Sequence, residues 1–167
     1  TGSGKTIMMA DFVQRFLNDN KNKKDLFFIW VCPGAGGLEE QSKAKLEDYV
    51  GDSNLFECIF FDDLDENVIY PNQILFLNWE KINKKNNRII TKNERGFDLM
   101  TVVTNSKDEG AELVLIIDES HHSGGSDKSK EIISDLSPKL SINVSATPTL
   151  SGDEKVNVYI EDVKNEG

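Results

Sequence analysis

The first six residues have the composition of a loop that binds phosphate. The sequence TGSGKT at residues 1–6 matches the end of the pattern G-x-x-x-x-G-K-[ST]. Glycines in such a loop allow successive backbone N–H groups to turn toward phosphate oxygens. Lys5 would place a positive charge on the β- and γ-phosphates, and the Thr6 hydroxyl would bind Mg²⁺. We therefore expect an ATP site formed by Gly2, Ser3, Gly4, Lys5 and Thr6.

Two adjacent carboxylates follow a continuous apolar stretch near residue 115. Residues 113–117 (LVLII) run directly into Asp118 and Glu119. At the end of a buried strand, one such acid binds Mg²⁺ and its neighbour orients and deprotonates the attacking water. We therefore expect Asp118 to be a metal ligand, and Lys5, Asp118 and Glu119 to be the catalytic residues. The alternative is a solvated acidic turn, which the upstream phosphate loop disfavours.

Two histidines follow these acids without the partners that a zinc site needs. His121 and His122 are adjacent, and no Cys or His lies at ligand spacing from them. We therefore expect His121 to connect the nucleotide site to the next motif rather than to bind a metal.

Apolar runs that alternate with amphipathic segments indicate the elements that position these side chains. We expect strands at 26–32, 55–61, 74–77, 113–117, 141–144 and 156–160, helices from about residue 5 and at 38–50, 97–109 and 128–136, and loops at 62–67, 81–93 and 123–126. Strands that alternate with helices predict an α/β fold with a mainly parallel sheet. In such a sheet, ligands bind beyond the carboxyl ends of the strands.

Composition sets limits on the class of protein. The chain has 167 residues, which fits one domain, and 19 Lys and Arg against 29 Asp and Glu give it a net charge of −10. This charge excludes a binding module that depends on bulk positive charge. The longest apolar run is too short to span a bilayer, so we expect no membrane partner. Cys32 and Cys58 lie in apolar runs, which indicates buried thiols and a cytoplasmic location.

Three motifs together resemble a known family. TGSGKT at 1–6, DESH at 118–121 and SATP at 145–148 occur in the order of motifs I, II and III of superfamily-two helicases and translocases. They resemble the first RecA-like lobe of those motors. PGAGGLEEQS (33–42), LFLNWEKIN (75–83) and IIDESHHSG (116–124) are similar to the Res (restriction) subunit of type III restriction–modification systems.

The resemblance implies a three-layer αβα RecA-like P-loop domain. This lobe would occupy residues 1–150, and residues 151–167 would lead toward a second RecA-like lobe in the same protein. The strand that precedes the phosphate loop would lie upstream of Thr1, so we expect an N-terminally truncated domain. The second lobe would supply an arginine that stabilises the transferred phosphoryl group. We therefore expect the chain alone to bind nucleotide weakly and to hydrolyse it very slowly.

The resemblance also implies a function for the parent protein. It would be an ATP-dependent type III site-specific deoxyribonuclease that moves on duplex DNA and acts with a modification (methyltransferase) subunit. Ser145 and Thr147 would couple the nucleotide state to DNA binding. Loops at strand ends would contact DNA phosphates through backbone N–H groups, without net positive charge. The DNA-binding residues expected there are Gly34, Gly36, Gly37 and Asn78.

Two other interpretations remain open at this point. The chain could be a P-loop ATPase or helicase without nuclease function, such as a transport or assembly ATPase, or a nucleotide-binding fragment that is inactive alone. The DESH and SATP motifs argue against an ATPase without a nucleic-acid role. The presence of Lys5, Asp118 and Glu119 argues against a module that has lost catalysis.

Overall fold

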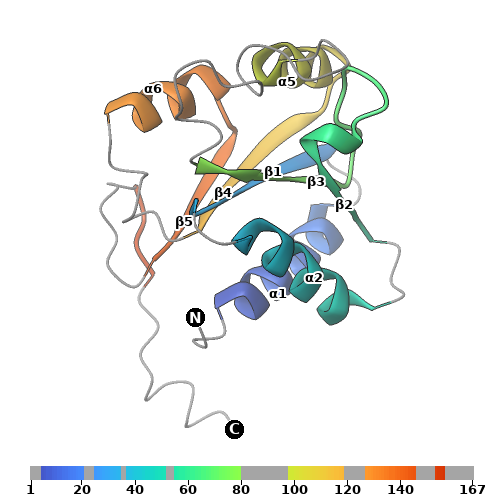
Figure 1. Ribbon diagram of the computed structural model, residues 1–167, viewed down its shortest axis with the longest axis vertical. Helices are drawn as coiled ribbons and strands as arrows, with labels where there is room; N and C mark the ends of the chain where they lie inside the picture. Colours follow the sequence, from blue (N-terminus) through green and yellow to red (C-terminus); the bar gives the residue numbers. More distant parts are fainter. Residues whose placement is uncertain are drawn as a thin grey trace, which may run out of the picture.

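A parallel sheet lies between two layers of helices (Figure 1). The computed structural model describes residues 5–20, 25–34, 37–51, 55–79, 98–118, 127–145 and 153–156, without the side chains of residues 6, 20, 50, 127 and 128. The strands are β1 (Leu26–Cys32), β2 (Glu57–Phe60), β3 (Gln73–Asn78), β4 (Glu112–Asp118) and β5 (Leu140–Val144). They form one five-stranded sheet in the order β2-β3-β1-β4-β5, and every neighbouring pair is parallel.

In the described part of the chain, two helices cover each face of this sheet. Helices α1 (Lys5–Asn20) and α2 (Leu38–Val50) lie on one face, and α5 (Leu99–Asp108) and α6 (Asp127–Leu136) lie on the other (Figure 1). The three layers confirm the predicted α/β fold of the RecA-like type, with a parallel sheet at its centre.

The central strand β1 explains why the fold has two hydrophobic cores. All seven of its residues are buried. Because side chains alternate along a strand, one set packs under α1 and α2 and the other set packs under α5 and α6. The first set contains Phe28, Trp30 and Cys32. The second set contains Phe27, Ile29 and Val31.

The helices follow from short-range sequence signals. In α1, the buried residues Met9, Val13 and Leu17 recur every four positions, which gives one apolar face. Helix α5 begins after Asp98, whose side chain accepts a hydrogen bond from the Thr101 N–H at 2.9 Å. These contacts fix which face of each helix meets the sheet.

Most predicted elements agree with the structure to within two residues, and one strand is shorter than expected. The apolar run 55–61 predicts a strand to its end, but β2 ends at Phe60 and a 3₁₀ turn, η1 (Phe61–Asp63), follows. The Asp63 carboxylate accepts a hydrogen bond from the Phe60 N–H at 3.0 Å, which turns the backbone away from the sheet.

The last predicted strand and two predicted loops lie partly or wholly outside the described residues. Residues 153–156 form no strand, so the expected strand 156–160 does not begin at its first position, and its other residues lie outside the described part. The predicted loops 81–93 and 123–126 also lie outside it.

Two further predictions concern the cysteines and membrane-spanning segments. Cys32 and Cys58 are buried and free, as expected. Within the described ranges, every helix is too short or too polar to cross a membrane.

Candidate functional site

Asn78 and Asp118 place two polar side chains at the carboxyl edge of the sheet. Asn78 ends β3 and lies opposite Cys32, the last residue of β1. The preceding residue of β1 pairs with Ile117, so Cys32 is also level with Asp118 at the end of β4. Asp118 in turn lies opposite Val144, the last residue of β5. The parallel register therefore brings these strand ends to one edge, as the sequence predicts for a ligand site.

The first turn of α1 lies at this same edge and carries Lys5. Figure 1 shows the amino-terminal turns of α1 and α2 on the side where the strands end. Of the charged side chains in the described part of the chain, Lys5 has the largest effect on the pKa of Asp118, which its positive charge lowers. The structure thus places Lys5 within electrostatic range of Asp118. The amino end of α1 adds a partial positive charge suited to an anion.

Asp118 occupies an unusual electrostatic position. Burial raises the pKa of its carboxyl group, and the charges of Lys5 and Lys45 offset only part of that effect. Its Oδ1 atom is buried and has no hydrogen-bond partner among the described residues. A buried carboxylate oxygen without a donor is costly in the free protein. The same oxygen is a suitable ligand for a divalent cation such as Mg²⁺, so this residue fits the predicted metal site.

Helix α2 places two buried polar side chains near the end of β1, and the sequence analysis did not identify them. Glu39 and Ser42 lie three positions apart on α2, and both are buried. The Ser42 side chain lies close to Cys32 and lowers the pKa of its thiol, by less than burial raises it. Burial raises the pKa of the Cys32 thiol to about 12, so the thiol is neutral at physiological pH. Two adjacent acids, Glu39 and Glu40, lie in the first turn of α2, a pattern that is typical of an exposed turn. The sequence therefore gives no indication that Glu39 is buried.

The glycine at the start of α2 has a conformational role. Gly37 precedes the helix with φ 69°, in the left-handed region. A Cβ atom at this position would lie 3.2 Å from Oε2 of Glu40. Both observations favour glycine here irrespective of any contact with DNA.

The predicted DNA-contact residues are not equally accessible. Gly34 is partly exposed and Gly37 is exposed, whereas Asn78 is only 5% exposed. The neighbouring Trp79 is 1% exposed, so the end of β3 is a buried segment. The structure therefore places Asn78 at the correct edge, but beneath the surface.

The other predicted site residues are only partly described. Ser145 follows β5 directly and is half-buried near the level of Asp118. For Thr6 the structure gives only the backbone, in the first turn of α1. Outside the described residues lie Gly2, Ser3, Gly4, Gly36, Glu119, His121 and Thr147. Among the residues that the structure does describe, no group of three or more His, Cys, Asp or Glu side chains could hold a metal ion by itself.

Comparison with known proteins adds one finding. Residues 1–150 match the family described as type III restriction enzyme, res subunit. A comparison with curated proteins found no match. The family match includes both Lys5 and Asp118.

Proposed function

Because the chain belongs to the type III restriction enzyme res subunit family and is a helicase-like ATPase lobe, we propose that it is the ATP-binding motor lobe of a DNA-dependent translocase. The observation that supports this most strongly is the position of Asp118. Asp118 is the last residue of β4, at the edge where a parallel sheet binds ligands, and the charge of Lys5 acts on it. Its buried Oδ1 atom has no hydrogen-bond partner among the described residues. We propose that the lobe extends over residues 1–150 and that residues 151–167 lead to a second RecA-like lobe.

Residues 2–6, which lead into the first turn of α1, would bind the nucleotide. Backbone N–H groups of Gly2, Ser3 and Gly4 would bind the phosphate oxygens, and Lys5 would contact the β- and γ-phosphates. The Thr6 hydroxyl and the Asp118 carboxylate would hold Mg²⁺. When bound, this ion would neutralise charge on the phosphate oxygens and stabilise the Asp118 carboxylate against its burial.

Hydrolysis would depend on the residue after Asp118. The Glu119 carboxylate would accept a proton from the attacking water and orient that water toward the γ-phosphate. Adjacent side chains at a strand end point in different directions. This difference is why one acid of the pair can bind metal while the other binds water.

Coupling to DNA would use the next strand of the sheet. Ser145 follows β5, which pairs directly with β4, so a change at Asp118 has a short route to Ser145. We propose that His121, Ser145 and Thr147 transmit the nucleotide state to the DNA-binding loops. Gly34, Gly36 and Gly37 would contact phosphates through their N–H groups. Because Asn78 is buried, its part in DNA binding would require the end of β3 to open.

The parent protein would combine this lobe with other parts. We propose that a second lobe supplies the arginine that accelerates hydrolysis, that a nuclease domain cleaves duplex DNA, and that a modification subunit assembles with the protein in the cytoplasm. In that arrangement the chain alone binds nucleotide weakly and hydrolyses it very slowly. A cytoplasmic location agrees with the two free, buried thiols.

ATP hydrolysis by the full-length protein, with and without duplex DNA, tests this proposal. We expect DNA to stimulate hydrolysis, and we expect Glu119→Gln to abolish hydrolysis while ATP still binds. Glu131→Gln, which removes an exposed carboxylate from α6, is the matched control and should leave the rate unchanged. Hydrolysis that ignores DNA would favour a P-loop ATPase without a nucleic-acid role, and a fully active Glu119→Gln variant would overturn the assignment of the base.

A further inference from the structure

A pocket of about 810 Å³ opens at the amino ends of β2 and β3. Its walls are the end of α2 at Glu47 and Gly51, residues 55–58, and the turn at residues 70–73. The nucleotide-site residues lie at the other ends of the strands, and a strand of six residues is about 20 Å long. The pocket is therefore a separate feature from the proposed nucleotide site.

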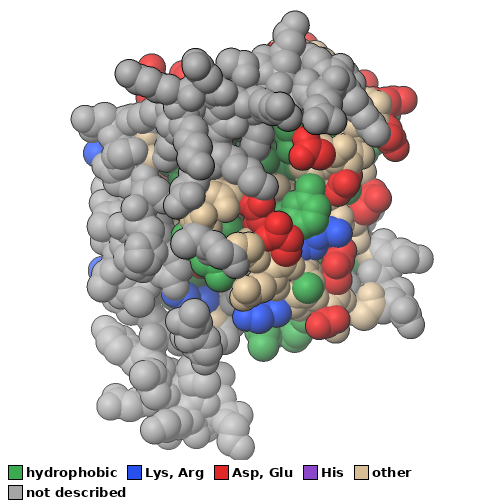
Figure 2. All heavy atoms as spheres, viewed as in Figure 1, with side chains coloured by type: hydrophobic (Ala, Val, Ile, Leu, Met, Phe, Trp, Pro, Cys, Tyr) green, Lys and Arg blue, Asp and Glu red, His purple; other side chains and the backbone are tan. Residues whose placement is uncertain are grey.

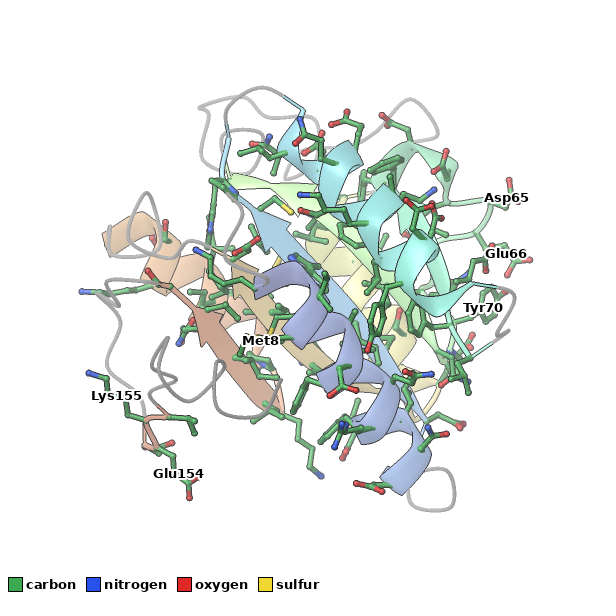
Figure 3. All side chains as sticks on the ribbon, turned by 90° about the horizontal axis from the view of Figure 1, so that it is seen from below. Met8, Asp65, Glu66, Tyr70, Glu154 and Lys155 are labelled. Atoms are coloured by element: carbon green, nitrogen blue, oxygen red, sulfur yellow. The ribbon has the colours of Figure 1, made fainter. Side chains whose placement is uncertain are left out.

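One side chain links the backbone of Tyr70 to the carboxylate of Glu57 in this pocket. The Gln73 Oε1 atom accepts a hydrogen bond from the Tyr70 N–H at 2.8 Å, and its Nε2 donates to Glu57 at 2.8 Å. The Tyr70 hydroxyl donates to Glu66, and Figure 3 shows these two residues side by side at the edge of the molecule. Gln73 thus fixes the Glu57 carboxylate relative to the backbone of Tyr70, and the contact with Glu66 orients the Tyr70 ring.

The turn that carries these groups is anchored to the central strand. Asn72 has φ 65°, in the left-handed region that Asn tolerates better than most residues. Its N–H donates to the Leu26 carbonyl at 2.7 Å, and the Glu57 N–H donates to the Asn72 carbonyl at 3.0 Å. The pocket floor is therefore tied to β1 and β2, which keeps the ordering cost of binding low.

The electrostatics of the pocket favour a cation. Among the described residues, the lining includes Glu47 and Glu57 and no Lys or Arg. The last turn of α2 also contains no basic residue, so its partial negative charge adds to those of the carboxylates. Lys43 pairs with Oε1 of Glu47 at 3.2 Å and neutralises only part of this charge. On the face drawn in Figure 2, acidic side chains are more abundant than basic ones among the described residues.

We propose that this pocket docks an arginine side chain on an extended, basic segment of a partner polypeptide. The planar guanidinium matches both features of the pocket, because it can stack on the Tyr70 ring while it donates hydrogen bonds to Glu57 and Glu47. A lysine ammonium is a compact, strongly hydrated charge and stacks less well. The chain's net charge of −10 attracts such a segment over longer distances.

Binding of synthetic peptides to the chain tests this proposal. The probes are a labelled peptide of alternating arginine and glycine and its lysine counterpart, followed by fluorescence anisotropy. We expect the arginine peptide to bind more tightly than the lysine peptide. We expect Glu47→Gln combined with Glu57→Gln to weaken arginine-peptide binding about tenfold, because both charged acceptors are lost. Binding of ATP should not change.

Two matched comparisons separate this site from general attraction to an acidic protein. Glu131→Gln combined with Asp135→Asn removes the same charge from exposed positions of α6 and should change peptide affinity less than about twofold. Tyr70→Leu should weaken binding about threefold, whereas Tyr70→Phe retains the ring and should not. Equal loss in both double variants, equal affinity for the two peptides, or no binding would overturn the proposal.

Discussion

The two ends of β4, one at each edge of the sheet, differ in how completely their carboxylates are satisfied. At the amino edge, the loops that enter the strands are tied by backbone hydrogen bonds, such as the one from the Glu112 N–H to the Asp25 carbonyl at 2.9 Å. Lys139 also pairs with Glu112 at 2.8 Å. At the carboxyl edge, Asp118 has a buried oxygen without a hydrogen-bond donor among the described residues, and its pKa is raised.

This difference indicates a division of labour within one sheet. The bonded groups named at the amino edge contribute stability to the free chain, because their hydrogen bonds are already made. Groups at the carboxyl edge reduce stability until a ligand supplies the missing interactions, which is common at functional sites. Substitutions at the two edges should therefore change different quantities, and the following predictions are ordered by expected effect.

The largest effect should follow removal of the cation at the carboxyl edge. Lys5→Ala should lower the affinity for Mg–ATP about 100-fold, or about 2.7 kcal/mol, because a charged contact to phosphate is lost. Titration calorimetry measures this affinity. Lys45→Ala is the matched control, since Lys45 is exposed on α2 and acts less strongly on Asp118. The assignment of Lys5 would be wrong if both variants lost the same affinity.

The second effect should appear in stability and not in binding. The buried Ser106 hydroxyl accepts a hydrogen bond from the Ile69 N–H and donates to the Val102 carbonyl, each at 2.8 Å. Ser106→Ala leaves the Ile69 N–H buried and unpaired, which should cost about 1–3 kcal/mol in the free energy of unfolding. Denaturant titration measures this change. ATP affinity should remain within about twofold, because this contact anchors the segment that leads to the amino edge.

An exposed serine provides the control for this measurement. Ser134 lies on the exposed side of α6, and Ser134→Ala should change the unfolding free energy by less than about 0.5 kcal/mol. If Ser106→Ala weakened ATP binding more than it weakened the fold, the proposed separation of the two edges would be incorrect.

The smallest effect should be a gain in stability at the carboxyl edge. Asp118→Asn removes a charge whose burial raises the pKa above its ordinary value of 3.8. The wild-type fold favours the protonated acid, so its stability falls as pH rises from that value through the raised pKa. In the absence of metal and nucleotide, the variant should therefore be more stable than wild type near neutral pH, by up to about 1 kcal/mol.

Thermal unfolding between about pH 4 and pH 8 measures this gain. The difference between the Asp118→Asn variant and the wild type should increase with pH and then level off. A variant that is less stable at every pH would show that the carboxylate stabilises the free fold, which is the opposite of the division described above.

Much of the fold could be predicted from the sequence because its central strands are continuous apolar runs. β1 and β4 are buried on both faces, and such strands have few polar positions to confuse their assignment. The predicted end of β2 was wrong because Phe61 continues the apolar run, whereas the Asp63 carboxylate accepts a hydrogen bond from the Phe60 N–H and the chain turns there. A hydrophobic pattern contains no information about that hydrogen bond.

The candidate site was also predictable only in part. The location of Lys5 and Asp118 at one edge follows from a general property of parallel sheets, in which strand ends and helix starts lie on the same side. The burial of Glu39 was not predictable, because an acid in the first turn of a helix is ordinarily exposed. The same limit applies to Asn78, whose burial depends on how α2 and the end of β3 pack together.

The central claim is that Lys5 and Asp118 act on one Mg–ATP, and the magnesium dependence of ATP affinity tests it most directly. ATP affinity is measured with Mg²⁺ and with EDTA for the wild type, Lys5→Ala and Asp118→Asn. We predict that Mg²⁺ tightens binding to the wild type, that Asp118→Asn removes this gain while retaining the metal-free affinity, and that Lys5→Ala weakens binding in both conditions. A full magnesium gain in Asp118→Asn would contradict the claim.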